Sequence, residues 1–374
     1  MAGTYYILFV DDLNMPQREE YFAQPPIELL RQWCDYKGWY DRKERTFRKI
    51  IDTVLLAAMG PPGGGRNPIT SRMVRQFNMI SQTEMDHESM ALIFGTILRN
   101  FLDRSGFDPS IQSMVDATVN GSTAIYETVQ VELLPTPSKP HYTFNLRDMG
   151  KVFQGMLMAD TKTTLDGRDF LRLWVHECRR VFADRLINDQ DRLWFDRKLK
   201  GLVEGQFKRS WEDDVVGDVD AAAGGSEEGV HASDTQSIPK IIFGDFMTTD
   251  PDARKYEEIK DLGKLQPAIE EYLGDYNGES KNPMHLVMFL DAMQHVSRIA
   301  RVLRQPSGNS LLLGVGGSGR QSLTRLATFI GDFHPRQVEI SKGYGQAEWR
   351  DDLKDILMKA GVEEQRTVFI FNDT

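Results

Sequence analysis

Residues 311–322 read Leu-Leu-Leu-Gly-Val-Gly-Gly-Ser-Gly-Arg-Gln-Ser and decide the fold. An apolar strand runs into a glycine-rich loop, and a helix follows the loop. Phosphate-binding loops have the pattern Gly-x-x-x-x-Gly-Lys followed by Ser or Thr, and Gly314 and Gly319 stand at that spacing. Glycines let the backbone turn sharply and bring several N–H groups onto phosphate oxygens at the positive end of a helix. The stretch therefore predicts a nucleotide-binding loop.

The candidate nucleotide contacts are the consecutive loop residues Gly314, Val315, Gly316, Gly317, Ser318, Gly319, Arg320, Gln321 and Ser322. Arg320 stands where the pattern has lysine, and its planar guanidinium is not interchangeable with a compact ammonium. Gln321 stands where the pattern has the Mg²⁺-binding hydroxyl, and Ser322 follows one position later. We expect ATP or ADP with Mg²⁺ at this loop. The alternative is a degenerate loop that only packs.

Two apolar strands end in carboxylates, at residues 6–12 and 368–373. One nucleotide site cannot use both, so we expect the chain to begin inside one nucleotide-binding module and to stop inside the next. Asp373 is the candidate Mg²⁺ ligand of the second module. A carboxylate that activates the attacking water usually comes next. Thr374 stands there instead, so we expect little or no hydrolysis at this site.

The first module offers Asp11 and Asp12 as its candidate catalytic pair. They follow a buried-type strand at its carboxyl end, which is where ligands bind in open α/β sheets. The phosphate loop that would complete this site is expected upstream of Met1, so the chain would hold half a site. The alternative for Asp12 is that it only caps the following turn.

Three arginines are candidates for contacts with a bound nucleotide. Arg72 and Arg75 precede an expected strand at residues 77–80, where an arginine can reach a neighbouring module's phosphates and stabilise charge. Arg147 stands at the expected start of a helix, from which it could fold back over a nucleotide. The alternatives are a surface ion pair for the first two and a capping or surface role for Arg147.

Composition limits the remaining classes of function. The chain has 374 residues and a net charge of −10, with no basic surplus or stripe, so we expect no nucleic-acid partner. No apolar run reaches the length of about 18 residues that a membrane span needs, so no membrane partner is expected. Two cysteines cannot form a disulfide framework, which favours a reducing compartment.

The hydrophobic pattern predicts an α/β fold in which parallel sheets have flanking helices and a helical lid is added. Strands are expected at 5–10, 53–59, 77–80, 310–313, 337–340 and 367–371. Helices are expected at 26–38, 70–75, 90–102, 111–134, 146–158, 168–187, 190–200, 284–304, 320–330 and 346–360. The expected divisions are a first core at 1–87, a helical lid at 88–205, an acidic disordered linker at 206–237, helices at 238–306 and the loop-bearing core at 307–374.

Long motifs in the chain resemble those of the dynein heavy chain, at residues 7–16, 24–32, 60–68, 145–148, 243–246, 291–296 and 314–323. They are similar to parts of the third and fourth AAA+ modules of that family. The Asp11-Asp12 pair and Arg320 resemble the ciliary, axonemal type. The resemblance assigns Asp11 and Asp12 to the Walker B segment of the third module, Arg147 to its second sensor, and Arg75 rather than Arg72 to the arginine finger.

The resemblance also implies a whole protein that is a minus-end-directed microtubule motor ATPase of the cytoskeleton, in the axoneme of a cilium or flagellum. Its implied partners are the microtubule through a coiled-coil stalk, intermediate and light chains through a tail, and neighbouring AAA+ modules. The third and fourth modules would bind nucleotide and regulate. The alternatives are another concatenated AAA+ remodelling ATPase, such as a midasin-like protein, or a structural ring segment that binds no nucleotide.

Overall fold

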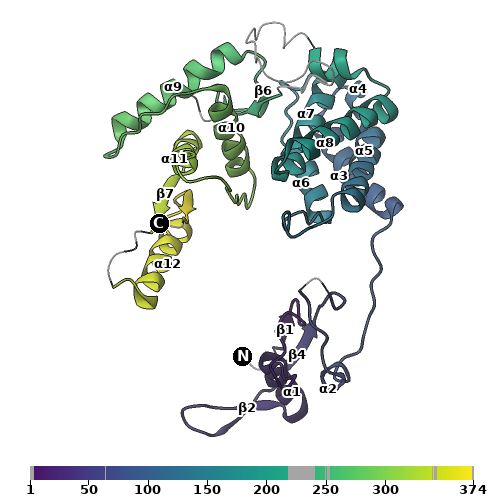
Figure 1. Cartoon of the computed structure of the whole chain (residues 1–374), viewed down its shortest axis with the longest axis vertical. Coiled ribbons are helices and arrows are strands. Elements are labelled where there is room, and N and C mark those ends of the chain that lie inside the picture. The colour runs from purple at the N-terminus through teal and green to yellow at the C-terminus, as the bar shows by residue number, and fades with distance from the viewer. Residues whose placement is uncertain are drawn as a thin grey trace. The chain divides into compact units, whose positions relative to one another are not determined.

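The structure is a computed structural model that describes residues 4–63, 65–217, 241–248, 250, 253–338, 340 and 343–372. The chain divides into two compact units, Met1–Glu84 and Met85–Thr374, which are described separately (Figure 1). The fold is α/β, with small parallel sheets and a helical layer, as the sequence predicts.

The first unit is built on two parallel strands, β1 (Tyr6–Val10) and β4 (Thr53–Ala57). Their expected positions are therefore confirmed, but the burial expected of the first strand is not, since Tyr6, Ile7 and Phe9 are 60%, 66% and 60% exposed. Helix α1 (Pro25–Tyr36) lies between them in sequence and begins with two prolines, which suit the first turn of a helix because their missing N–H groups would have no partner there. The short helix α2 (Ser71–Val74) completes the unit. The core of the unit consists of Leu13, Ile27 and Met73 with the partly buried residues around them.

Two features of the first unit differ from expectation. A hairpin of β2 (Gly38–Tyr40) and β3 (Phe47–Lys49) lies in a charged stretch for which no strand is expected. The strand expected at 77–80 is wrong, since residues 78–80 have no regular structure. Phe77 packs on the core, but Met79 and Ile80 are 70% and 86% exposed, and no strand among the described residues pairs with this stretch.

A helical layer occupies the first part of the second unit (Figure 1). It contains α3 (His87–Ser105), α4 (Pro109–Gln112), α5 (Val115–Glu132), α6 (Leu146–Met156), α7 (Gly167–Val181), the 3-10 turn η1 (Ala183–Arg185) and α8 (Asp189–Leu202). Helix α7 lies at the centre of its core. Five of the six residues from 170 to 175 are apolar and fully buried, namely Phe170, Leu171, Leu173, Trp174 and Val175. The helix expected at 111–134 is divided in two at Ser113 and Met114.

The helical layer extends further than the sequence indicates. Two π-helical turns, η2 (Val203–Phe207) and η3 (Trp211–Val216), follow α8. Trp211 and Val215 are buried in the core of the layer, so a disordered linker starting at residue 206 is wrong as far as Gly217. Residues 218–237 of that expected linker lie outside the described residues.

The chain continues through a short antiparallel pair, β5 (Phe243–Gly244) and β6 (Glu257–Glu258), into two helices. These are α9 (Leu262–Glu279), which the sequence analysis does not identify, and α10 (Leu290–Arg304). The helix expected at 284–304 starts at Leu290 instead. The amide side chain of Asn277 bonds both the N–H and the C=O of Met284, which holds that stretch in an extended turn.

The C-terminal part forms a parallel βαβ unit. Helix α11 (Arg320–Ile330) has the bounds that the sequence predicts, and strands β7 (His334–Gln337) and β8 (Thr367–Ile370) pair in parallel with α12 (Gln346–Gly361) between them. The strand expected at 337–340 lies three positions earlier in the chain. The strand expected at 310–313 is wrong here, because it pairs with no other strand among the described residues. None of the described helices is both long and apolar enough to cross a bilayer.

Candidate nucleotide-binding site

The glycine-rich loop has a backbone that glycine favours at two positions. Gly317 has a φ of +80° and Gly319 a φ of +76°, both in the left-handed region that L side chains rarely adopt. A Cβ added at Gly316 would meet no atom within 4 Å. Gly319 is the N-cap of α11 and supplies no side-chain cap, so the first turn of that helix presents its N–H groups to the space beside the loop.

Arg320 lies back toward the start of the loop. A Cβ built on Gly314 would stand 3.0 Å from Oγ of Ser318 and 3.5 Å from Cδ of Arg320, so these two side chains flank the glycine. The helix that follows is anchored by Leu323, Leu326 and other apolar residues that are buried against α10 and α9. The loop is therefore an exposed, glycine-shaped turn on a firmly packed helix.

A short polar chain connects the base of α11 to the carboxyl end of β8. Arg325 donates to Oε1 of Gln337 at 2.7 Å, and Nε2 of Gln337 donates to Oδ1 of Asn372 at 3.3 Å. The strand end that carries the expected Mg²⁺ ligand is thereby tied to the helix behind the loop. Asp373 and Thr374 themselves lie outside the described residues. Ser322 is half-buried in the first turn of α11.

In the first unit, the aspartate pair lies where β1 ends. The backbone N–H of Asp12 donates to Oδ1 of Asp11 at 3.0 Å, and Asp12 has a φ of +48°. The guanidinium of Arg66 lies 3.5 Å from Oδ1 of Asp12. Asn14 donates from Nδ2 to the carbonyl oxygen of Gly60 at 2.8 Å, which ties the end of β1 to the loop after β4.

Arg66 is a residue of this site that the sequence analysis does not single out. Its guanidinium contacts Gly60 so closely that a Cβ there would stand 2.9 Å from one of its nitrogens. In the sequence, Arg66 directly follows three glycines in the loop after an apolar strand, and this position is the signal that could have suggested a role in the site. The positive charge of Arg66 thus partly offsets the negative charge of Asp12 within the same unit.

The two candidate finger arginines differ in their surroundings. Arg75 has a guanidinium nitrogen 3.6 Å from Oδ1 of Asp35 on α1, with 64% of its side chain exposed. Arg72 is exposed on α2, and no ion pair of its side chain is found among the described residues. The surface ion pair left open for these arginines is thus formed by Arg75.

Arg147 occupies the first turn of α6. The turn is fixed by a reciprocal capping box in which the side chain of Asn145 accepts from the helix and the carboxylate of Asp148 accepts from the N–H of Asn145 at 3.1 Å. Asp148 in turn binds Arg185 at 2.6 Å. The side chain of Arg147 is exposed, and no partner for it is found in the described part of the chain. The capping box fixes the backbone of this turn, and the side chain of Arg147 is exposed to solvent.

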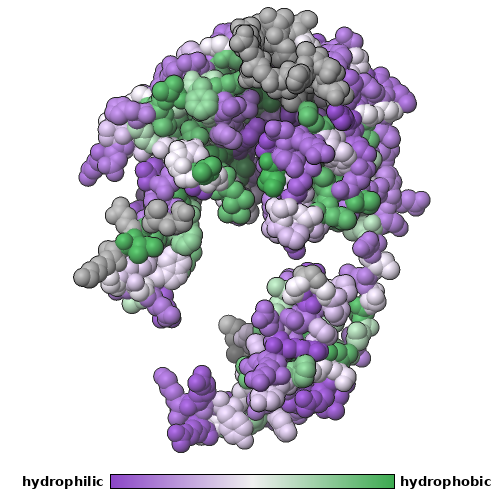
Figure 2. Space-filling view, viewed as in Figure 1, coloured by the Kyte–Doolittle hydropathy of each residue, from purple (hydrophilic) through white to green (hydrophobic). Residues whose placement is uncertain are grey.

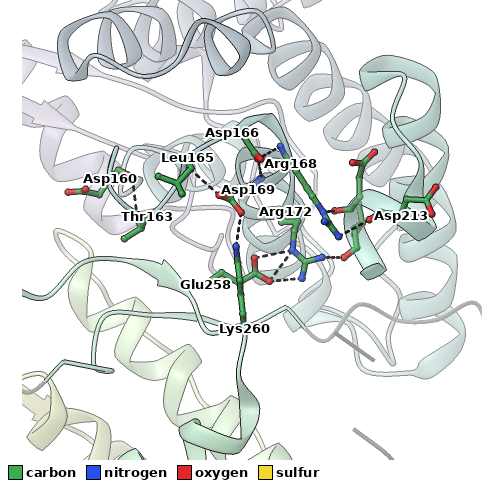
Figure 3. Close-up of polar contacts among 12 residues, drawn as sticks. Asp160, Thr163, Leu165, Asp166, Arg168, Asp169, Arg172, Asp213, Glu258 and Lys260 are labelled. Atoms are coloured by element: carbon green, nitrogen blue, oxygen red, sulfur yellow. Dashed lines mark hydrogen bonds and ion pairs between the residues drawn. The ribbon is translucent and has the colours of Figure 1, made fainter. Parts of the chain in front are cut away.

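A polar seam joins the helical layer to the segment that leads to the loop (Figure 3). The buried guanidinium of Arg172 on α7 binds both carboxylate oxygens of Glu258 on β6 at 3.0 Å from Nε, and Lys260 binds Asp169 at 3.0 Å. Bidentate pairs of this kind fix geometry as well as charge.

The deepest part of the seam is the pair of Glu177 on α7 and Arg301 on α10. Nε of Arg301 lies 3.1 Å from both carboxylate oxygens, and the hydroxyl of Tyr256 donates to Oε1 at 2.8 Å. Burial favours the neutral form of Arg301, but the charge of Glu177 outweighs it and raises the pKa of the guanidinium. Next to them, burial and the charge of Arg180 hold the pKa of His176 well below its ordinary value.

The structure brings the nine loop residues together, and separately brings Asp11 and Asp12 to the loop after β4. Among the described residues, no group of three or more His, Cys, Asp or Glu side chains could hold a metal ion.

Three family models match the chain. Residues 1–85 match the P-loop-containing dynein motor region, residues 118–219 match the AAA+ lid domain, and residues 284–374 match the P-loop-containing dynein motor region D4. The two motor-region matches cover the two candidate sites, and the lid match covers Arg147 and α7.

Full-length relatives give the same result. The chain is 48% identical over 383 residues to dynein axonemal heavy chain 1 of Homo sapiens, covering 100% of the chain and 8% of the relative. It is 43% identical over 376 residues to dynein axonemal heavy chain 3 of Mus musculus, covering 99% of the chain and 9% of the relative. It is 44% identical to dynein axonemal heavy chain 12 of Homo sapiens over 357 residues, 95% of the chain and 11% of the relative. The chain thus spans about a tenth of the length of these relatives, and it belongs to the dynein heavy chain family, axonemal type, as a stretch of the AAA+ motor region.

Proposed function

We propose that residues 314–322 bind ATP or ADP and that this site regulates the motor rather than driving it. The observation that carries the proposal is the loop itself, in which Gly317 and Gly319 have left-handed backbone and the uncapped first turn of α11 follows directly. Such a turn presents several N–H groups and the positive end of a helix to an anion.

The residues fit a nucleotide with Mg²⁺ in stated roles. The backbone N–H groups of residues 316–319 would hold phosphate oxygens. Arg320 would supply the positive charge that lysine supplies in the general pattern. Ser322 and Asp373 would assist the Mg²⁺ ion, which when bound neutralises phosphate charge. Without a carboxylate at position 374, we expect slow hydrolysis at best.

The remaining candidate residues belong to the preceding module in this proposal. Asp11 and Asp12 form its acidic pair, Arg147 is its lid arginine, and Arg75 reaches the nucleotide of another module. The division at 1–87, 88–205, 238–306 and 307–374 is proposed with them, the lid being extended to Gly217.

For the whole protein we propose a minus-end-directed microtubule motor of the ciliary axoneme. The names of the relatives, which are dynein axonemal heavy chains, support the axonemal part of this proposal. The direction of movement is proposed from the family resemblance alone. The microtubule, the neighbouring AAA+ modules, and intermediate and light chains are the proposed partners. The match to dynein motor regions disfavours a midasin-like remodelling ATPase. A structural segment without bound nucleotide is the outcome that the next experiment separates.

The test is equilibrium binding of a fluorescent ATP analogue to the full chain and to Gly319→Asp and Arg320→Ala variants. Gly201→Asp is the matched control, because Gly201 is exposed on α8 and a Cβ there meets no atom within 4 Å. We expect binding by the wild type and the control, and a loss of about tenfold or more in both loop variants. Equally poor binding by all four proteins would favour the structural segment.

A further inference from the structure

The hairpin β2–β3 of the first unit concentrates positive charge in an otherwise acidic chain. Residues 38–49 hold five lysines and arginines against two carboxylates, while the whole chain has a net charge of −10. Every residue from Arg42 to Lys49 is exposed. Figure 1 shows the hairpin extending away from β1 and β4, and Figure 2 shows its end as strongly hydrophilic.

The two carboxylates of the hairpin are occupied from within it. Arg48 lies 2.5 Å from Glu44 and 4.0 Å from Asp41. Asp41 also accepts from the backbone N–H groups of Glu44 and Lys43, and these bonds hold the pKa of its carboxyl below the ordinary value. A single arginine therefore uses both acids of the hairpin.

Four cations of the hairpin are left without an ion pair among the described residues: Arg42, Lys43, Arg45 and Lys49. Arg45 has a φ of +57°, a conformation that favours glycine. Its N–H donates to the carbonyl oxygen of Asp41 at 2.9 Å, so the tip is a closed turn with a fixed shape. The cations are thus presented from a preformed loop.

An exposed aromatic pair lies directly beside these cations. Tyr40 and Phe47 face each other across the two strands with ring centroids 5.2 Å apart, and they are 63% and 42% exposed. Aromatic residues and arginine are the types enriched at the energetic centres of protein interfaces. A surface made only for solubility needs cations but has no need for two exposed rings.

The base of the hairpin is fixed to α1, so its position within the unit is well defined. Nε1 of Trp39 donates to the carbonyl oxygen of Leu29 at 2.8 Å, and the rings of Trp39 and Trp33 lie 5.6 Å apart. A Cβ added at Gly38 would stand 2.3 Å from the carbonyl oxygen of Arg48, so the strands approach as closely as glycine allows. Because the hairpin is already fixed at its base, it would lose little conformational entropy when a partner binds.

We propose that the β2–β3 hairpin is a docking surface for an acidic segment of a protein partner that also carries an apolar side chain. The four unpaired cations would meet its carboxylates, and the Tyr40–Phe47 pair would meet its apolar group. A nucleic acid is the less suitable occupant. A long polyanion would extend past the hairpin and be repelled by the rest of a chain with net charge −10, whereas a short acidic segment would contact the hairpin alone.

The test uses the full chain and a fluorescein-labelled peptide rich in glutamate with interspersed leucines, followed by fluorescence anisotropy at low ionic strength. The variant Arg42→Glu/Arg45→Glu is expected to weaken binding by about tenfold or more, and added salt should weaken the wild type toward it. The matched control is Lys162→Glu/Lys281→Glu, which reverses two exposed charges elsewhere. Arg45→Gly suits the backbone of the tip and should still weaken binding several-fold; near-UV circular dichroism of Trp33 and Trp39 checks the fold.

Equal weakening in the hairpin variant and the control would overturn the proposal, because it would show an effect of net charge alone. Undetectable binding of the peptide to the wild type would overturn it as well. Tighter binding of a labelled single-stranded oligonucleotide than of the peptide, lost on Arg42→Glu/Arg45→Glu, would replace the protein partner by a nucleic acid.

Discussion

Replacing Arg301 by methionine should destabilise the helical layer more than replacing an exposed lysine by methionine does. The side chains of Arg301 and Glu177 are 6% and 0% exposed, so the variant leaves a carboxylate buried without its cation. Removing one partner of a buried pair costs about 3–5 kcal/mol. The hydroxyl of Tyr256 still donates to Glu177 and offsets a part of that cost. We expect a loss of roughly 3 kcal/mol in the free energy of unfolding.

Urea unfolding followed by tryptophan fluorescence measures this loss, because Trp174 and Trp211 are buried in the same layer. The control is Lys198→Met, which removes a pair with Glu132 whose side chains are 40% and 42% exposed. It should cost at most about 1 kcal/mol. The double variant Glu177→Met/Arg301→Met should recover stability relative to Arg301→Met. A loss in Arg301→Met no larger than that in Lys198→Met would refute the role assigned to the pair.

Three further outcomes follow from the described contacts. Gly155→Ala should destabilise the chain in thermal unfolding, because its Cβ would stand 1.7 Å from a carboxylate oxygen of Glu177; helix propensity alone predicts a gain of about 1 kcal/mol, so a stabilised variant would contradict the packing. His176 has a folded pKa below its unfolded value, chiefly because it is buried. The stability that depends on neutral His176 is therefore fully present above about pH 6.5 and is lost as the pH falls. Urea titrations from pH 7 to 5 give the free energy of unfolding at each pH, and its decrease per pH unit should be smaller in His176→Gln by up to about 1.4 kcal/mol. Gly38→Ala should separate the hairpin strands, seen as a change in the near-UV signal of Trp39, and an unchanged spectrum would argue against the close approach to Arg48.

Local patterns in the sequence are sufficient for the elements whose signals are local. Helix α11 begins at Arg320 as predicted because the glycine loop ends there, and β1 and β4 are continuous apolar runs. The β2–β3 hairpin escapes prediction because residues 41–49 are charged on both faces and have no period of two. Helix α9 could have been found from the spacing of Leu265, Ile269 and Tyr272, although Pro267 within it suggests a break.

The candidate site divides in the same way. The nine loop residues are consecutive in sequence, so their grouping requires no knowledge of tertiary structure. The contact of Arg66 with Asp12 and that of Arg301 with Glu177 join residues 54 and 124 positions apart, and no sequence spacing indicates them. The expected strand at 310–313 fails for a related reason, since a strand exists only where a neighbour completes its hydrogen bonds.

Amide hydrogen exchange with and without saturating Mg²⁺-ADP tests the nucleotide site most directly, because it reports where on the chain the ligand acts. We expect peptides that contain residues 314–323 to gain protection, and peptides of the helical layer around α5 to remain unchanged. Unaltered exchange throughout 314–323 at saturating nucleotide would contradict the account.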